Sequence, residues 1–293
     1  MELIGYRVIR KLGKGAQGSV YLAVRNYDNR YVAIKEVKIP KGIKFQTNLE
    51  RVLEEINILR SVSAEPTCNQ YISCYVDHKI DSERGIVFLI MEYIDGPNLK
   101  EYIQPFYEQQ DPVGLVETVF LVVKAITTAL KHIHDRNILH QDIKPENIVI
   151  NSQRVPKLVD FGVSCKTLPK YDDICLYPTK DLTVEVNKCC NTDGGTFMYI
   201  APEWILDNIR YPQSDIFSLG ATIYTILTGR VIWRAREIQE STSLDIILAM
   251  KSEQPEEIES NNILLNTLVN GMTRKDVLQR FTDDEVLNLL KDV

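Results

Sequence analysis

The chain has 293 residues, of which 44% are hydrophobic and 25% are charged, and its formal net charge at pH 7 is −6. This is the composition of an ordinary globular protein, and the length allows one large domain or two smaller lobes with a sizeable core. The negative charge disfavours nucleic acid and anionic membrane surfaces as partners, and no dense run of Lys and Arg offsets it.

Six cysteines are spread along the chain without a CxxC pair or a histidine at zinc-finger spacing. We expect the adjacent Cys189 and Cys190 to be reduced thiols at the surface. The N-terminus lacks the apolar core of a signal peptide, and the longest apolar stretch, around Ile216 to Leu227, is too short to span a bilayer. These features predict a soluble protein with no membrane span in a reducing compartment, the cytoplasm or also the nucleus.

The first ninety or so residues predict strands and one helix. Segments 6–12, 19–25 and 31–39 are rich in Val, Ile and Tyr and are separated by turn residues. Apolar residues at helical spacing predict a helix at about 47–62, and Thr47 with Glu50 suits a capping box at its start. Two more strands follow, the second within residues 87–96.

After Gly96 the pattern changes to long helices. An apolar stripe predicts a helix at 115–134. Segment 214–228 is apolar nearly all round and stops at Gly229, as expected of a helix in the centre of a lobe. The predicted fold class is therefore α+β, with a small β-rich lobe at about 1–93 and a larger, mainly helical lobe at about 94–293.

A glycine-rich segment lies between the first two predicted strands. Gly13, Gly15 and Gly18 allow the backbone to pass close over a phosphate chain and to point its amides at the charge. The same letters fit a plain glycine-rich hairpin or a dinucleotide site. A dinucleotide site would be followed by a helix, whereas residues 20–24 predict a strand, so the context favours a phosphate-binding flap.

Lys35 lies in the middle of an otherwise apolar face of the third predicted strand. A lysine in this position either snorkels to the edge or needs an anionic partner. In the functional interpretation it binds nucleotide phosphates and pairs with a carboxylate on the following helix. Glu55, beside the apolar stripe of that helix, is the preferred partner, and Glu54 is the alternative by charge alone.

Residues 140–147 read His-Gln-Asp-Ile-Lys-Pro-Glu-Asn. Asp142 can accept the proton of an attacking hydroxyl, and Lys144 can neutralise charge on a phosphoryl group in transfer. Asn147 and Asp160, the latter in an Asp-Phe-Gly motif, can bind a Mg²⁺ ion that bridges phosphates. A lone Asp-x-Lys is usually a surface ion pair, so this interpretation depends on the whole set.

In their order and spacing these motifs resemble the eukaryotic-type protein kinase family from end to end. The resemblance extends to Ala-Pro-Glu at 201–203, to Asp215 and to Arg280. It implies a two-lobed kinase fold, a structural pair of Glu203 with Arg280, and an Asp215 that braces the catalytic loop. It also implies ATP and Mg²⁺ as cofactors, with Met91 as gatekeeper and residues 92–94 as hinge. The nucleotide-binding residues that it implies are Leu12, Gly13, Gly15, Gly18, Val20, Ala33, Lys35, Glu55, Met91, Glu92, Ile94 and Val149.

The acceptor class follows from the same resemblance. Residues 144–147, Lys-Pro-Glu-Asn, are similar to those of serine/threonine kinases, and Thr196 is placed to hydrogen-bond Asp142 and Lys144. We therefore expect transfer of the γ-phosphate of ATP to Ser/Thr hydroxyls of protein substrates, with a mild preference for basic substrates through Glu146. The alternatives are a pseudokinase, which would lack a phosphoryl-transfer residue, and a small-molecule phosphotransferase, which would lack the Ala-Pro-Glu segment and Lys144.

Two features depart from the family pattern. Gln141 replaces the arginine usual between the catalytic His and Asp, and a neutral Gln forms no charge-assisted pair with a phosphate. We hypothesise that activity does not depend on phosphorylation at Thr192, beside which Asp193 already carries a negative charge. The activation segment, 160–203, is enlarged by residues 165–194, which are interpreted as a disordered insert, a docking loop for a regulatory partner or an autoinhibitory lid. A four-thiolate metal site there has the wrong spacing.

Overall fold

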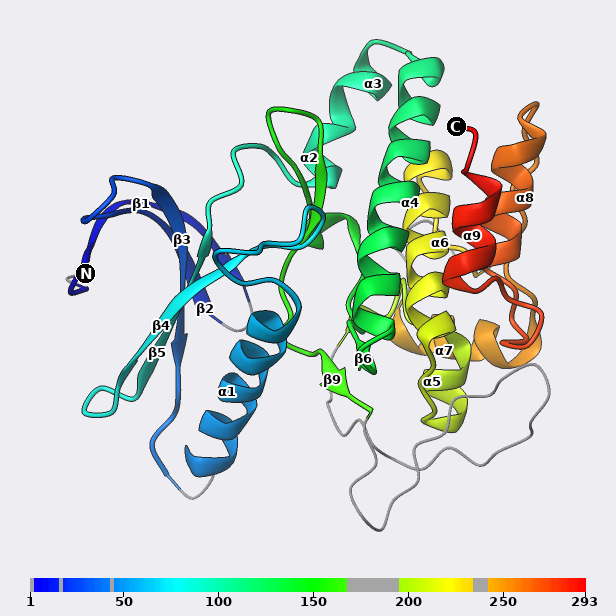
Figure 1. Cartoon of the computed structure of the whole chain (residues 1–293). Coiled ribbons are helices and arrows are strands. Elements are labelled where there is room, and N and C mark those ends of the chain that lie inside the picture. Colours follow the sequence, from blue (N-terminus) through cyan, green and yellow to red (C-terminus); the bar gives the residue numbers. More distant parts are fainter. Residues whose placement is uncertain (1–2, 16–17, 43–44, 168–194, 234–241) are drawn as a thin grey trace.

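The structure is a computed structural model, and it describes residues 3–15, 18–42, 45–167, 195–233 and 242–293 (Figure 1). A β-rich part with one long helix is followed by a larger helical part. The first part contains a five-stranded antiparallel sheet in the order β1-β2-β3-β5-β4. Its elements are β1 (Tyr6–Gly15), β2 (Gly18–Arg25), β3 (Tyr31–Lys38), α1 (Phe45–Val62), β4 (Tyr75–Asp81) and β5 (Ile86–Glu92).

The two faces of this sheet bury different sets of residues, as the alternation of side chains along a strand requires. Val32 and Ile34 of β3 pack in one small core with Phe88 and Ile90 of β5. Residues of the opposite face, such as Val37, pack in the main core together with α1. Lys35 shares this second face, so its side chain is directed to the helix side of the sheet.

Helix α1 begins at Phe45, two residues earlier than the sequence predicts, and ends at Val62. Thr47 lies inside the first turn of the helix, so the predicted capping box of Thr47 and Glu50 is wrong. Glu50 instead accepts a hydrogen bond from Gln46 at 3.1 Å. The buried stripe of α1 contains one charged residue, Glu55, in addition to its apolar side chains.

In its described residues the larger part contains helices and four short strands that form two pairs, β6–β9 and β7–β8. The helices described are α2 (Leu99–Tyr102), α3 (Gln104–Glu108), α4 (Pro112–His134), α5 (Pro202–Asp207), α6 (Pro212–Thr228), α7 (Ser243–Ser252), α8 (Ile263–Met272) and α9 (Asp283–Leu289). The strands are β6 (Ile138–Leu139), β7 (Ile148–Ile150), β8 (Pro156–Leu158) and β9 (Cys165–Lys166), and a 3₁₀ turn spans Pro145–Asn147.

Helices α4 and α6 form the centre of this part (Figure 1). Both begin earlier than predicted because each has a proline in its first turn, where no intrahelical donor is needed. Asp111 caps α4 by accepting the Gly114 amide at 2.9 Å. By length and composition α4 is apolar enough to cross a membrane. Its apolar stripe is instead buried in the protein core, where Val122, Ile126 and Ile133 have no exposed surface.

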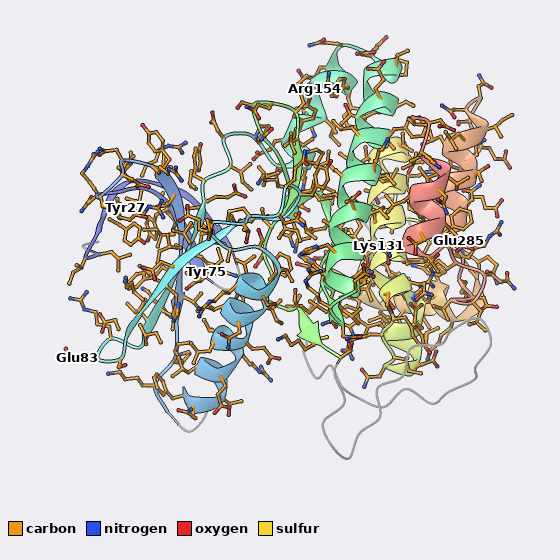
Figure 2. The ribbon with its side chains drawn as sticks, in the orientation of Figure 1. Tyr27, Tyr75, Glu83, Lys131, Arg154 and Glu285 are labelled. Atoms are coloured by element: carbon orange, nitrogen blue, oxygen red, sulfur yellow. A yellow bond between two sulfur atoms is a disulfide. The ribbon has the colours of Figure 1, made fainter. Side chains whose placement is uncertain are left out.

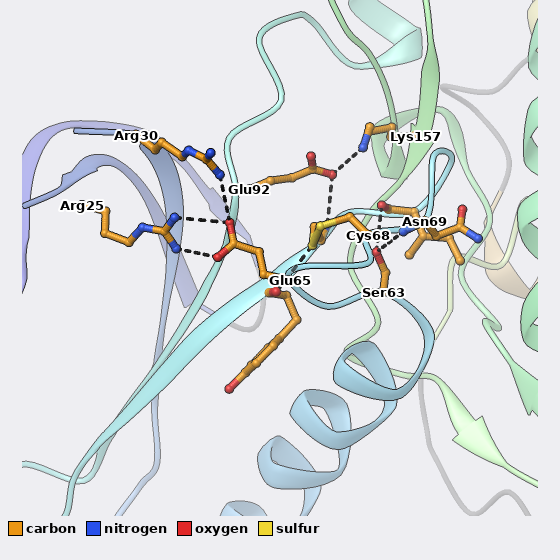
Figure 3. Close-up of a disulfide and its surroundings, with 11 residues drawn as sticks. Arg25, Arg30, Ser63, Glu65, Cys68, Asn69, Glu92 and Lys157 are labelled. Atoms are coloured by element: carbon orange, nitrogen blue, oxygen red, sulfur yellow. Dashed lines mark hydrogen bonds and ion pairs between the residues drawn. A yellow bond between two sulfur atoms is a disulfide. The ribbon is translucent and has the colours of Figure 1, made fainter. Parts of the chain in front are cut away.

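A disulfide joins Cys68 and Cys74 in the loop between α1 and β4 (Figure 3). Cys74 is buried and Cys68 is exposed. Cys165 is disulfide-bonded as well. These disulfide-bonded cysteines give no support to the predicted reducing compartment. The pairing of Cys68 with Cys74 depends on the loop turning back on itself, which sequence spacing does not reveal. Cys189 and Cys190 lie outside the described residues.

Candidate active site

The glycine-rich segment forms the end of the β1–β2 hairpin. Gly13 pairs with Val20 and Gly15 with Gly18, and residues 16–17 at the tip lie outside the described residues. A Cβ atom at Gly18 would lie 2.0 Å from the backbone oxygen of Glu36 in β3, so the close approach of β2 to β3 requires glycine here. Leu12 is on the same hairpin and is 36% exposed.

The sheet register gathers four of the expected nucleotide-binding residues on one face. Val20 lies opposite Lys35, and Ala33 lies opposite Met91. Residues that oppose each other in adjacent strands point to the same face, so these side chains line one surface of the sheet. Val149, which the resemblance places across the adenine ring, is half-buried on β7 in the helical part.

Lys35 joins the sheet, helix α1 and the Asp-Phe-Gly motif. Its Nζ lies 2.6 Å from Oε1 of Glu55 and 2.8 Å from Oδ1 of Asp160. Burial alone would lower the pKa of Lys35, but the two carboxylates outweigh burial and hold the pKa above its usual value. The expected Lys35–Glu55 pair is confirmed, whereas Glu54 is exposed.

The carboxylate of Asp142 is held by three neighbouring side chains. Lys144 Nζ lies 2.6 Å from its Oδ2, and Asn147 Nδ2 donates to the same oxygen at 2.9 Å. Thr196 Oγ1 donates to Oδ1 at 3.1 Å and accepts from Lys144 at 3.1 Å. The expected contacts of Thr196 are therefore confirmed, and Asp142 is fixed in one orientation.

Asn147 and Asp160, the expected metal ligands, are brought together by the backbone. The amide of Val159 donates to the backbone oxygen of Asn147 at 3.0 Å, and Asp160 follows with a φ of +63°. Because Asn147 Nδ2 donates to Asp142, its Oδ1 is the atom that faces a cation. Among the described residues no group of three or more His, Cys, Asp and Glu is arranged to hold a metal ion alone. An amide and a carboxylate oxygen, completed by phosphates, fit Mg²⁺.

Asp215 braces the backbone of the catalytic loop, as the resemblance implies. Its carboxylate accepts the amides of His140 and Gln141, both at 2.8 Å. Gln141 has a φ of +68°, which is unfavourable for a side chain of this kind and requires such support. The side chain of Gln141 donates from Nε2 to the backbone oxygen of Val163 at 2.8 Å. This bond joins the catalytic loop to the start of the activation segment, and no sequence pattern predicts it.

Glu203 and Arg280 form a buried bidentate pair, as expected. The two distances are 2.7 Å and 2.9 Å, and the side chain of Arg280 is fully buried. Ser214 donates to the same carboxylate at 2.6 Å. The pair fixes α5, which carries the end of the activation segment, to the segment before α9.

Glu92, which the resemblance implies as a hinge residue, makes side-chain contacts that the sequence did not indicate. Its Oε1 accepts the amide of Cys74 at 2.9 Å and pairs with Lys157 of β8 at 2.7 Å (Figure 3). Its side chain therefore connects β5 to the helical part. A Cβ atom at Gly96 would lie 1.9 Å from the oxygen of Ile150, so β7 runs directly against the segment after Ile94.

Glu146, expected near a basic substrate, lies 3.0 Å from Lys100 of α2, and both side chains are exposed. Thr192, Asp193 and most of the predicted insert lie outside the described residues.

The sequence was compared with models of known protein families. The protein kinase domain matches residues 6–290 of this chain. The chain belongs to the protein kinase family. This kinase is 26% identical over 296 residues to mitogen-activated protein kinase kinase 2 of Arabidopsis thaliana, which covers 98% of this chain and 72% of the relative.

Two further relatives of this kinase carry the serine/threonine designation in their names. It is 32% identical over 78% of its length to serine/threonine-protein kinase chk-1 of Caenorhabditis briggsae, and covers 41% of that protein. It is 26% identical over 96% of its length to the probable serine/threonine-protein kinase PknB of Lactococcus lactis, of which it covers 40%. These relatives support a serine/threonine protein kinase function. This kinase spans less than half the length of the last two.

Proposed function

We propose that this kinase transfers the γ-phosphate of ATP to serine and threonine hydroxyls of protein substrates, with Asp142 as proton acceptor. The observation that carries the proposal is the carboxylate of Asp142, which three neighbouring side chains hold in one orientation. A general base must be fixed within hydrogen-bond reach of the proton that it accepts. The contact with Thr196 also joins Asp142 to the end of the activation segment.

In the proposed reaction the substrate hydroxyl donates a hydrogen bond to Asp142 and transfers its proton there as the new O–P bond forms. The bond between the γ-phosphorus and the β–γ bridging oxygen breaks, and ADP leaves with that oxygen. Lys144, already 2.6 Å from Asp142, donates to the oxygens of the phosphoryl group in transfer. Lys35, oriented by Glu55, binds the non-transferred phosphates from the sheet side. When bound through Asn147 and Asp160, Mg²⁺ supplies positive charge that offsets the phosphate charge.

The remaining expected residues orient the nucleotide. The glycine-rich hairpin provides backbone amides above the phosphates, with Gly13, Gly15 and Gly18 allowing the close approach. Adenine is bound by backbone atoms of residues 92–94. The side chain of Glu92 takes no part in this binding, because it is already paired with Lys157. The apolar side chains around the ring are Leu12, Val20, Ala33, Met91 and Val149.

The test is transfer of labelled phosphate from Mg-ATP to casein, to myelin basic protein and to the kinase itself. We expect label on serine or threonine, and a loss of about 10²–10⁴-fold in Asp142→Asn, since the base is removed while the fold is kept. Asp292→Asn, at an exposed position near the C-terminus, is the matched control and should retain wild-type activity. A folded, ATP-binding wild type that transfers no phosphate would contradict the proposal and support the pseudokinase alternative.

A further inference from the structure

His134, at the C-terminal end of α4, lies between carboxylates from two other helices. Its Nδ1 is 2.9 Å from Oδ2 of Asp283 at the start of α9, and its Nε2 is 3.0 Å from Oδ2 of Asp215 in α6. The side chains of His134, Asp283 and Asp215 are only 4%, 13% and 2% exposed. Helices α4, α6 and α9 stand side by side, with Lys131 of α4 and Glu285 of α9 labelled in Figure 2.

Both ring nitrogens of His134 face hydrogen-bond acceptors. A neutral imidazole has a single N–H, so it would present a lone pair to one of the two carboxylates. Burial alone would lower the pKa of His134, but Asp283 and Asp215 outweigh burial and raise it to about 10. The ring therefore carries two protons at neutral pH and donates to both carboxylates.

The other charged groups around His134 are directed elsewhere. Lys131, one turn earlier on α4, pairs with Asp135 and with the exposed Asp284. Of the strands that pack against α4, β6 contains only Ile138 and Leu139, and the ammonium of Lys157 in β8 pairs with Glu92. Asp283 and Asp215 are thus the charged groups that determine the protonation of the His134 ring.

The second carboxylate of this arrangement connects the ring to the catalytic loop. Oδ2 of Asp215 accepts from His134 and from the amide of His140, and Oδ1 accepts the amide of Gln141. Gln141 has a left-handed backbone conformation and directly precedes Asp142. A rotation of the Asp215 carboxylate would release this conformation and move the proposed base.

We propose that Asp283 is a positioning residue for the phosphoryl-transfer reaction, acting through the ring of His134 and the Asp215 carboxylate on the backbone before Asp142. This inference rests on the proposed function. Oδ1 of Asp283 is buried and has no hydrogen-bond partner among the described residues, so the charge of Asp283 is balanced by His134. The neighbouring Asp284 is 68% exposed and contacts Lys131 instead.

The kinetic test compares Asp283→Asn with Asp284→Asn, which removes the same charge from the same helix turn. We expect Asp283→Asn to lower kcat about tenfold with KM for ATP within about twofold, since a small displacement of the base affects the chemical step. Its kcat should also fall with rising pH between about pH 6 and 9, because His134 with one carboxylate loses its proton in that range. Asp284→Asn should show neither effect.

A second measurement is independent of catalysis. The chain has four histidines, so ¹H–¹⁵N spectra of the imidazole rings can follow His134 directly. In the wild type both ring nitrogens should stay protonated at pH 8, and in Asp283→Asn one should lose its proton below pH 8. The backbone amides of Gln141 and Asp142 should shift in Asp283→Asn and not in Asp284→Asn.

Each outcome decides the inference. A wild-type His134 that is neutral at pH 8 overturns it, even if Asp283→Asn fails to fold. A folded Asp283→Asn with the wild-type kcat and pH profile also overturns it, because a purely structural contact would change only the melting temperature. If the wild type transfers no phosphate, the proposed function fails, and the ring protonation and the amide shifts still confirm or overturn the link to the catalytic loop.

Discussion

Replacing Glu203 by Gln is the most direct test of how the helical part is held together. The substitution keeps the size of the side chain and removes its charge. Arg280 then remains fully buried without a counter-charge, although it still donates to the backbone oxygens of Arg274 and Gln213 at 2.8 Å and 3.0 Å. Such hydrogen bonds satisfy the donors of a guanidinium but not its charge.

The magnitude follows from the burial of the pair. Removing one partner of a buried ion pair costs about 3–5 kcal/mol, and since Gln retains one acceptor oxygen we expect a value near the lower end, about 3 kcal/mol. Unfolding entropy is about 2.1 cal/mol/K per residue, which for a chain of 293 residues converts this loss into a decrease in Tm of about 5 °C.

The assay is thermal unfolding followed by circular dichroism, with urea unfolding as a second measure of the free energy. The matched control is Glu257→Gln, which breaks an Arg–Glu contact of 3.0 Å with Arg274 on the surface, where the side chains are 49% and 55% exposed. This control should cost less than about 0.5 kcal/mol. Equal losses in Glu203→Gln and Glu257→Gln would refute the argument from burial.

Three further predictions follow from the site. Lys35→Met should lower kcat/KM for ATP by about 100-fold or more, because it removes the cation that Glu55 and Asp160 orient. Lys38→Met, at an exposed position of the same strand, is the control and should leave kcat/KM unchanged. A decrease of less than about threefold in Lys35→Met would contradict the role of Lys35. Thr192→Ala should retain activity within about twofold, since Gln141 bonds a backbone oxygen in place of a phosphate, and an inactive but folded variant would show that the hypothesis is wrong. The pairing of His134 stabilises the fold fully below about pH 6.5 and is lost as pH rises through about 10, so the stability difference between wild type and Asp283→Asn should shrink over that interval in urea unfolding.

The sequence predicted those parts of the fold that local patterns determine. The helix at 214–228 was recognised from its apolar residues and from Gly229, which indeed ends α6 with a φ of +68°. Its start, like that of α4, was missed because proline in a first turn has the same appearance as a loop residue. The start of α1 was misjudged because polar residues near Thr47 resemble a cap whether or not the helix begins there.

For the site, the sequence supplied residues and their order, while contacts between distant segments came from the structure. Lys35 and Glu55 were paired correctly because both lie on faces that local periodicity defines. The bond from Gln141 to Val163 and the contact of His134 with Asp283 join segments whose meeting depends on tertiary packing. Neither contact changes the hydrophobic pattern, so no local signal marks it.

The loop after α1 holds the C-terminal end of that helix, so the helix can rotate about this end. The amide of Ser73 donates to the backbone oxygen of Leu158 at 2.9 Å, and the Leu158 amide donates to the backbone oxygen of Tyr71 at 2.8 Å, which attaches this loop to the strand before Asp160. The loop in turn holds the C-terminal end of α1, because the amide of Tyr75 donates to the backbone oxygen of Ser63 at 2.8 Å. Glu55 lies seven residues from Val62, about 10 Å along the helix axis. A pivot of about 10° at the moored end would carry Glu55 through about 2 Å, enough to break its 2.6 Å contact with Lys35. A rotation of this one helix by about 10° therefore suffices to separate Glu55 from Lys35.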